Sequence, residues 1–382
     1  MATGHAEISG AGIAGLITAC ALAQRGWSVR VHERDADLRS YGAGISCWYN
    51  FVKVIRAVGA RPYLNDNRPF YIRETRDERN RVLYTIKASA KPHEETFLVS
   101  RHALLQALAT AARQAGVEIV FSSRAVAADP AGALILQDGT RCPADLVVAA
   151  DGVNSAVRDS LGLVKRRRKL MQGAIRVMIP RTELECRSED GKKGIEYWSG
   201  RRRIYYSAAN SNEVYLAFML DEGDREGVQV PLNKATWISS FPHLKDLIER
   251  VGDQGRWDNF EQISLTSWSR GRVAVVGDAA HAMAPNIGQG GGMAAVNALA
   301  LGATVASAGS IEEGLRRWEQ VERPLTDYTQ RVSYWYGRIN DLPGWLRTPV
   351  IKLCGQVRWI VAIRQRPANH NPTGWTAETQ NA

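Results

Sequence analysis

The chain is 382 residues long, with 45% hydrophobic residues, 23% charged residues and a formal net charge of +10. These values are typical of a globular protein with one large or two moderate domains. Five scattered cysteines without a CxxC pair argue against a disulfide framework and structural zinc, so we expect no metal site. The N-terminus shows no basic-then-apolar signal segment, which predicts a cytoplasmic protein without a membrane partner.

The N-terminal segment has the pattern of a dinucleotide-binding unit. A strand-like run ends at Ser9, GAGIAG occupies residues 10–15, and a helical run leads to a second strand that ends at Glu33. Glycines in this pattern make the tight turn, let the backbone approach a pyrophosphate and allow close packing of helix on strand. We expect the Glu33 carboxylate to accept both hydroxyls of an adenosine ribose, which excludes a 2′-phosphate.

Two later segments repeat the order of strand, glycine and helix, namely residues 145–162 and 273–301. The carboxyl ends of parallel strands converge on one ligand crevice, so three such ends predict a cofactor longer than one nucleotide. The last segment contains Gly288, Gly290, Gly291 and Gly292, which we expect to lie against a large flat group, because glycine lets another group approach the backbone.

Residues 166–264 contain alternating strand-like runs that predict an antiparallel sheet. Positive charge is concentrated at Lys165–Lys169 and Arg201–Arg203. No nucleic-acid motif accompanies these runs, so we expect solvated basic segments and no nucleic-acid partner. The polar or aromatic side chains inside apolar strands are candidates for ligand binding: Arg176, Arg203, Tyr206 and Tyr215.

The remaining chain reads as helical. We expect one amphipathic helix from Ile311 to Arg323 and another from Leu325 to Ile339, separated at Pro324. The predicted fold is α/β, with a Rossmann-like dinucleotide-binding domain of the GxGxxG type, an antiparallel β-sheet substrate domain and C-terminal helices. The expected boundaries are 1–70, 95–165 and 265–310 for the nucleotide domain, 71–94 and 166–264 for the substrate domain, 311–366 for the helices and 367–382 for a loose tail.

GAGIAGL, DGVNSAVR and GDAAHAMAPNIGQGGGMAAVNA together resemble the three signatures of the single-component flavin-dependent aromatic hydroxylases, the para-hydroxybenzoate hydroxylase-like group. Further stretches, including GAGISCWYN from Gly42, resemble its hydroxypyridine-carboxylate oxygenases. The resemblance implies FAD as cofactor, NADH or NADPH as transient co-substrate, and transfer of oxygen from dioxygen by a C4a-hydroperoxyflavin. The cofactor contacts that it implies are Gly10, Gly12, Ile13, Ala14, Gly15, Glu33, Arg34, Gly44, Arg101, Val126, Asp151, Asp278, Pro285, Gly288, Gly290, Gly291, Gly292 and Met293.

The resemblance also implies a substrate pocket. Its catalytic members would be Arg176, Arg203 and Tyr215, with Pro285 near the reactive edge of the flavin. The full set of substrate contacts is Ser46, Tyr71, Arg176, Arg203, Tyr206, Tyr215 and Phe260. Ser46 and Phe260 stand where that subgroup has tyrosines, so the same substrate does not follow. The arginines suit a carboxylate, which a guanidinium can bind through two hydrogen bonds.

Three functions remain open from the sequence. The first is hydroxylation, with or without ring opening, of a hydroxylated N-heteroaromatic carboxylate such as a hydroxypyridine acid. The second is hydroxylation of a carbocyclic, salicylate-like phenolic acid, with or without loss of the carboxyl group. The third is a flavin reductase or flavin-binding interaction protein without oxygenase activity. A homodimer is the candidate assembly.

Overall fold

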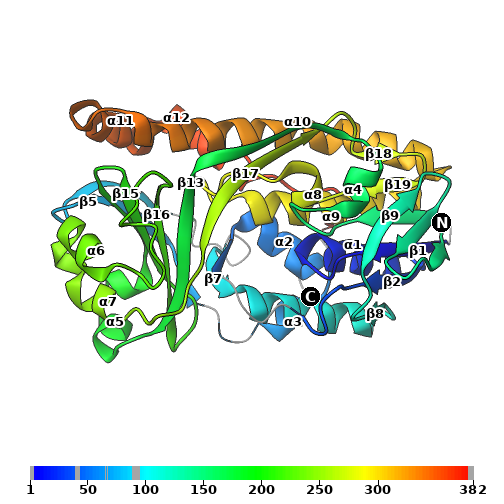
Figure 1. The fold of residues 1–382 in the computed structure, drawn as a ribbon, viewed down its shortest axis with the longest axis horizontal. Coiled ribbons are helices and arrows are strands. Elements are labelled where there is room, and N and C mark those ends of the chain that lie inside the picture. The colour runs from blue at the N-terminus through cyan, green and yellow to red at the C-terminus, as the bar shows by residue number, and fades with distance from the viewer. Residues whose placement is uncertain (1–3, 39–43, 65, 67, 88–94, 377–382) are drawn as a thin grey trace.

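A computed structural model describes residues 4–38, 44–64, 66, 68–87 and 95–376. Figure 1 shows two parts side by side, with one long helix, α10, running along both. We name them the nucleotide-binding part and the substrate part, after the roles expected from the sequence. Within the GAGISCWYN stretch, residues 42 and 43 lie outside the described ranges.

The nucleotide-binding part is built on a six-stranded sheet in the order β18-β19-β12-β1-β2-β8. All its pairs are parallel except β18–β19. Helix α1 packs against α9 and α3 on one face, while a three-stranded antiparallel sheet lies near β1 on the other. Because both faces are covered, β12 is apolar and fully buried, and β1 is buried from Ala6 to Ser9 although it carries Glu7 and Ser9.

The bounds of this part follow from the chain in order. Its strands are β1 His5–Ser9, β2 Ser28–His32, β3 Gly44–Cys47, β4 Arg68–Pro69, β7 Phe97–Ser100, β8 Glu118–Val120, β9 Ala125–Asp129, β10 Ala133–Leu136, β11 Arg141–Pro143, β12 Leu146–Ala149, β18 Ser269–Arg270 and β19 Val273–Val275. Its helices are α1 Ile13–Ala23, α2 Tyr49–Ala57, α3 Arg101–Gln114, α4 Ala156–Ser160, α8 Asp278–His281 and α9 Gly290–Ser307, with a 3₁₀ turn at Arg61–Tyr63.

The substrate part is a seven-stranded sheet in the order β17-β13-β16-β15-β14-β5-β6, antiparallel except for the β14–β5 pair. Its strands are β5 Ile72–Asp77, β6 Val82–Lys87, β13 Val164–Pro180, β14 Gly194–Ser199, β15 Arg202–Ala208, β16 Glu213–Asp221 and β17 Trp257–Leu265. Its helices are α5 Glu183–Arg187, α6 Lys234–Ser240 and α7 Lys245–Glu249, with 3₁₀ turns at Asp190–Lys192 and Pro242–Leu244.

The two faces of this sheet differ. One face packs with Trp237, Phe241 and Ile248 into a core of its own, under α6 and α7. The other face carries Tyr215, Ala217 and Phe260 in a cluster that also includes Ala284, which directly precedes Pro285. This second face therefore looks toward the loop that leads into α9, as a roof over that loop.

The C-terminal helices differ from the expectation at Pro324. One helix, α10, runs without interruption from Ile311 to Arg338 and contains Pro324 in its interior. A proline removes one backbone hydrogen bond, and packing along α9 offsets that loss here. The chain continues through a 3₁₀ turn at Ile339–Asp341 to α11 Gly344–Gln356 and α12 Arg358–Gln365.

The first ten residues of the expected tail are packed. The Ala368 carbonyl accepts a hydrogen bond from the backbone N–H of Asn50 (3.0 Å), and the Thr373 hydroxyl donates to the Glu322 carboxylate (2.6 Å). Trp375 lies against the core of the nucleotide-binding part. These contacts hold residues 367–376 on the surface instead of leaving them loose.

Helix α9 is, by length and composition, apolar enough to cross a membrane, the one such helix in the described part of the chain. It is 78% buried, between α1, α2 and α10. That position accounts for its composition as a central core helix.

Candidate active site

The GAGIAG turn has the geometry of a pyrophosphate cradle. Gly10 has a φ of +100°, and a Cβ there would lie 2.7 Å from the Ala150 carbonyl oxygen. A Cβ on Gly15 would lie 1.9 Å from the Gly10 oxygen, so Gly15 is required for packing. A Cβ on Gly12 would meet nothing within 4 Å, which leaves open space at the N-terminus of α1. Helix N-termini favour phosphate through their free N–H groups.

Glu33 lies where the ribose site was expected. Its carboxylate accepts hydrogen bonds from the backbone N–H groups of Ala11 (2.9 Å) and Asp35 (3.1 Å). Each carboxylate oxygen has further lone pairs, so these bonds orient the group without saturating it. Arg34 beside it is exposed, and Ile13 and Ala14 form the first turn of α1. Val126 is half-buried on β9.

The DGVNSAVR motif joins two strand ends. Arg158 is fully buried and donates to the Val153 carbonyl (3.0 Å) and the Ala279 carbonyl (3.1 Å). It therefore ties α4 to α8. Asp151 follows β12, burial raises its pKa, and its Oδ1 atom is buried with no hydrogen-bond partner among the described residues. An unsatisfied buried acceptor at this place suits a ligand with hydroxyl or amide donors.

Asp278 begins α8 beside the pyrophosphate cradle. Gly277 has a φ of +69°, and a Cβ there would lie 2.8 Å from the Ala14 Cβ, so α8 and α1 start close together. Asp278 is exposed to solvent. Desolvation raises its pKa and the nearby positive charge of Arg101 opposes that rise.

Three of the four glycines in the glycine-rich loop lie against other side chains of the protein. Gly288 has a φ of +67°, and a Cβ there would lie 3.0 Å from Trp48 Nε1. A Cβ on Gly292 would lie 3.1 Å from Asn50 Oδ1, and one on Gly291 3.4 Å from the Phe51 ring. These three glycines therefore make room for side chains at and before the start of α2.

Gly290 alone of the four glycines has no neighbour closer than 3.7 Å to its Cβ position. Of these four glycines, Gly290 therefore has the most open surroundings. The Pro285 carbonyl accepts a hydrogen bond from the Gly288 N–H (2.8 Å) and so shapes the loop. The Met293 side chain is fully buried, which leaves its backbone for a cofactor contact.

On the substrate sheet, Arg176, Tyr215 and Phe260 come together. Arg176 lies beside Tyr215: burial raises the pKa of the Tyr215 hydroxyl, and the positive charge of Arg176 opposes that rise. The Arg176 guanidinium lies 5.6 Å from the centre of the Phe260 ring and 3.7 Å from an oxygen of Asp258. The cation therefore already has a carboxylate partner within the protein.

Arg203 lies on the same face but is separated from Arg176 by strand β16. It is 1% exposed and donates to Asn286 (2.9 Å), in the loop before α9, and to Glu196 (3.3 Å). Its guanidinium also lies 4.9 Å from the Trp198 ring centre. Arg176 and Arg203 thus each have a carboxylate partner of their own within the protein.

Tyr206 points away from this face. It belongs to the core under α6 and α7, because side chains alternate along β15. Its neighbour Tyr205 was not among the residues expected from the sequence. Tyr205 lies on the face with Arg203 and Tyr215, and its ring centre is 6.2 Å from that of Tyr215. The alternation itself was the available signal, since Tyr205 follows Arg203 by two residues.

The remaining expected pocket residues lie near this face or at its edge. Ser46 of β3 lies near Tyr205, whose pKa is raised to about 12 by burial. A Cβ on Gly44 would lie 2.8 Å from the Tyr215 ring, which brings β3 against the roof. Tyr71 is 40% exposed.

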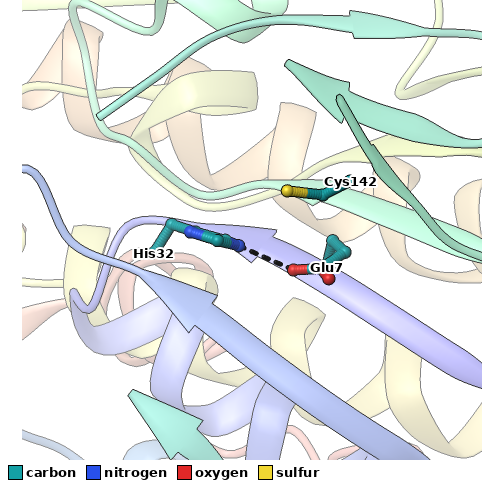
Figure 2. Close-up of side chains that lie close together, drawn as sticks. All are labelled: Glu7, His32 and Cys142. Carbon is teal, nitrogen blue, oxygen red and sulfur yellow. Dashed lines mark hydrogen bonds and ion pairs between the residues drawn. The ribbon is translucent and has the colours of Figure 1, made fainter. Parts of the chain in front are cut away.

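A separate buried cluster lies between β1, β2 and β11 (Figure 2). The possible ligand atoms of Glu7, His32 and Cys142 all lie within 4.8 Å of one another. The Glu7 carboxylate is 2.7 Å from His32 Nε2, 2.9 Å from His5 Nε2 and 3.3 Å from Arg30. Burial raises the Glu7 pKa, but hydrogen bonds from the two histidines outweigh it and the net pKa is lowered. Because these groups already pair with the carboxylate, the cluster reads as an ion-pair network.

Comparison with known proteins decides the family. Residues 5–317 match the family described as FAD binding domain. The chain belongs to the FAD-dependent aromatic monooxygenases. It is 42% identical to a 2-heptyl-3-hydroxy-4(1H)-quinolone synthase of Mycobacteroides abscessus, over 94% of this chain and 96% of that protein. A 6-hydroxynicotinate 3-monooxygenase of Bordetella bronchiseptica is 29% identical, over 88% of this chain and 93% of that protein.

Among solved structures, the tetrameric form of 2-methyl-3-hydroxypyridine-5-carboxylic acid oxygenase matches with a TM-score of 0.88 and 36% identity, over 98% of this chain and 99% of that one. The expected family, fold class and FAD cofactor are thereby confirmed, and NAD(P)H is the reductant typical of the family. The open N-terminus of α1, the free Asp151 acceptor and the accessible Asp278 fit that cofactor.

Proposed function

We propose that this monooxygenase hydroxylates the ring of a 2-alkyl-4-quinolone at the carbon between the alkyl-bearing carbon and the oxo group. The observation that carries this proposal is the pairing of both expected substrate arginines with carboxylates of the protein itself. Arg176 pairs with Asp258 and Arg203 with Glu196. A neutral ring suits such a site better than a carboxylate, which would have to compete with these internal partners.

The side chains of the roof suit an apolar ligand. The cluster on that face contains Phe70, Leu98, Met219 and Phe260, with Met178 packed against it. An alkyl chain gains about 0.8 kcal/mol for each CH₂ group that it buries. Methionine adapts to ligands of variable shape because its side chain is unbranched and flexible. The 42% identity to a quinolone synthase supports the same substrate class.

FAD, when bound, supplies the activation of dioxygen and the oxygen atom that is transferred. The residues that would hold it are Glu33 at the ribose, the open end of α1 at the pyrophosphate, and Asp278 with Arg101 further along. Pro285 and the loop to Gly290 lie under the roof and would border the flavin. Tyr215 and Tyr205 supply hydroxyl groups on the roof that can orient a ring oxygen or nitrogen.

The hydroxypyridine-carboxylate reading remains the second candidate. The similarity to 2-methyl-3-hydroxypyridine-5-carboxylic acid oxygenase covers nearly the whole chain, and Arg176 is half-buried instead of fully enclosed. Its 3.7 Å separation from Asp258 is longer than a strong ion pair, so a substrate carboxylate can displace that partner.

Equilibrium binding and turnover separate the two candidates. Purified holoenzyme is titrated with 2-heptyl-4(1H)-quinolone and with 6-hydroxynicotinate, and flavin absorbance and substrate-stimulated NAD(P)H oxidation are followed. The proposal expects a response to the quinolone at concentrations at least tenfold lower. A response confined to the carboxylate would replace the quinolone by the second candidate.

We also propose that the chain self-associates through its C-terminal helices. Trp345 and Trp359 are 78% and 65% exposed, and Trp335 on α10 is 67% exposed. Exposed tryptophans on neighbouring helices are typical of interfaces. The related oxygenase is described as tetrameric. Sedimentation of the wild type and of the Trp345→Glu, Trp359→Glu double variant tests this; equal masses would contradict it.

A further inference from the structure

Arg73 on the substrate face has no carboxylate partner among the residues that the structure describes. The guanidinium of Arg73 on β5 lies 4.0 Å from the centre of the Trp48 ring, and no ion pair joins it to a carboxylate among the described residues. By contrast, Arg176 and Arg203 on the same face each have a carboxylate within 4 Å. Arg73 is therefore the one of these three arginines whose charge is available to a ligand.

Arg73 is directed to the roof by its strand register. It stands opposite Gly194 of β14, which in turn lies beside β15. A Cβ on Gly194 would lie 2.9 Å from the Tyr205 hydroxyl and 3.6 Å from Arg73 Cγ. Glycine at this position leaves room for both side chains, which places Arg73 next to Tyr205.

Trp48 links Arg73 to the glycine-rich loop. Its Nε1 atom is 3.0 Å from the position of a Cβ on Gly288, and this N–H has no hydrogen-bond partner among the described residues. The Arg73 charge therefore lies one aromatic ring away from the loop that borders the flavin. A ligand that lies between this loop and the roof is within reach of the guanidinium.

The surroundings of Arg73 make a bound anion favourable. Burial, together with the positive charge of Arg364, lowers the pKa of Arg73 to about 10. Arg364 is itself held by the Tyr84 hydroxyl (3.2 Å) and lies 4.1 Å from the Tyr336 ring centre. Two desolvated cations repel each other, and an anion bound beside Arg73 relieves that cost. At neutral pH the Arg73 guanidinium remains charged.

We propose that Arg73, stacked on Trp48, binds the anionic oxygen of the heteroaromatic substrate. This inference rests on the proposed function for the kind of ring. An oxo- or hydroxy-heterocycle ionises when its N–H or O–H bond breaks. The proton goes to water, and the electron pair stays on the ring, delocalised onto the oxygen. The ionised ring is richer in electrons at carbon, so Arg73 favours the form that accepts an electrophilic oxygen atom.

The test compares Arg73→Met with Arg79→Met, an exposed arginine in the turn after β5. Each holoenzyme is titrated with 2-heptyl-4(1H)-quinolone, and the pH at which the bound ring ionises is read from its ultraviolet absorbance. Arg73→Met is expected to bind at least tenfold more weakly and to raise that ionisation by about one pH unit, which corresponds to a tenfold change. FAD content and the Arg79→Met protein are expected to match the wild type.

Unchanged affinity and unchanged ionisation in Arg73→Met would overturn the inference. If Arg73→Met does not retain FAD, Arg73→Gln replaces it in the same comparison. If the wild type binds 6-hydroxynicotinate but not the quinolone, the proposed substrate fails, while the loss of 6-hydroxynicotinate affinity in Arg73→Met still decides the role of Arg73. Failure of both probes to bind wild-type holoenzyme would overturn it, because Arg73 then has no heteroaromatic anion to bind.

Discussion

The Arg203 guanidinium donates a 2.9 Å hydrogen bond to the side-chain oxygen of Asn286, and the Asn286 amide donates to the Ser333 carbonyl of α10 at 3.2 Å. One side chain thus connects the substrate sheet, the loop before α9 and the long C-terminal helix. A Cβ on Gly337 would lie 2.2 Å from this amide, so α10 is shaped to admit it.

Asn286→Ala is expected to loosen the loop under the roof and to let water reach it. Exclusion of water protects reactive intermediates in such sites. The fraction of NAD(P)H oxidation that yields hydroxylated product should fall severalfold, with hydrogen peroxide accounting for the difference. Product and peroxide are measured together, and the exposed Asn212→Ala is the control. An unchanged product fraction would contradict the positioning role of Asn286.

Substitutions of two glycines in the GAGIAG turn should affect FAD binding and protein stability differently. Gly12→Ala adds a methyl group to open space, so the protein should fold and lose FAD affinity at least tenfold. Gly15→Ala places a methyl group 1.9 Å from a carbonyl oxygen and should reduce the yield of folded protein. Flavin content and urea unfolding distinguish the two effects. Equal loss of stability in both variants would count against the open space at Gly12.

His281 should make stability depend on pH. Burial lowers its pKa from 6.5 to about 4, and Asn297 Nδ2 lies 2.9 Å from its Nε2 atom. The unfolded chain therefore takes up a proton before the folded chain as pH falls. The stabilisation is fully present above pH 6.5 and is lost toward pH 4, by about 2 kcal/mol between pH 7 and pH 5. Urea unfolding at both values, with His281→Asn for comparison, measures this difference; identical pH dependence would contradict it.

The nucleotide-binding part could be predicted from the sequence because its signals are local. Glycines, strand ends and an acid at fixed spacing report the turn at Gly10 and the carboxylate of Glu33 without reference to distant residues. Glycine also has packing roles that sequence does not separate from ligand roles. Gly288, Gly291 and Gly292 make room for Trp48, Phe51 and Asn50, which are remote in sequence.

The substrate site was harder because its energetics depend on partners from other strands. In the sequence Arg203 is a cation without an evident partner, whereas in the structure it donates hydrogen bonds to Glu196 and Asn286. A strand also changes face with every residue, so choosing Tyr206 instead of Tyr205 moved that contact to the opposite side of the sheet. Arg73 lies on the short hairpin β5–β6, two residues after Tyr71, and nothing in the local sequence pattern distinguishes it as a site residue.

Isotope labelling of the product tests the central claim most directly. Holoenzyme is supplied with 2-heptyl-4(1H)-quinolone, NAD(P)H and ¹⁸O₂, and the product is analysed by mass spectrometry and NMR. The account predicts one ¹⁸O atom in a new hydroxyl group next to the oxo-bearing carbon. A hydroxylated product without ¹⁸O, or NAD(P)H oxidation that yields only hydrogen peroxide with this ring, would contradict it.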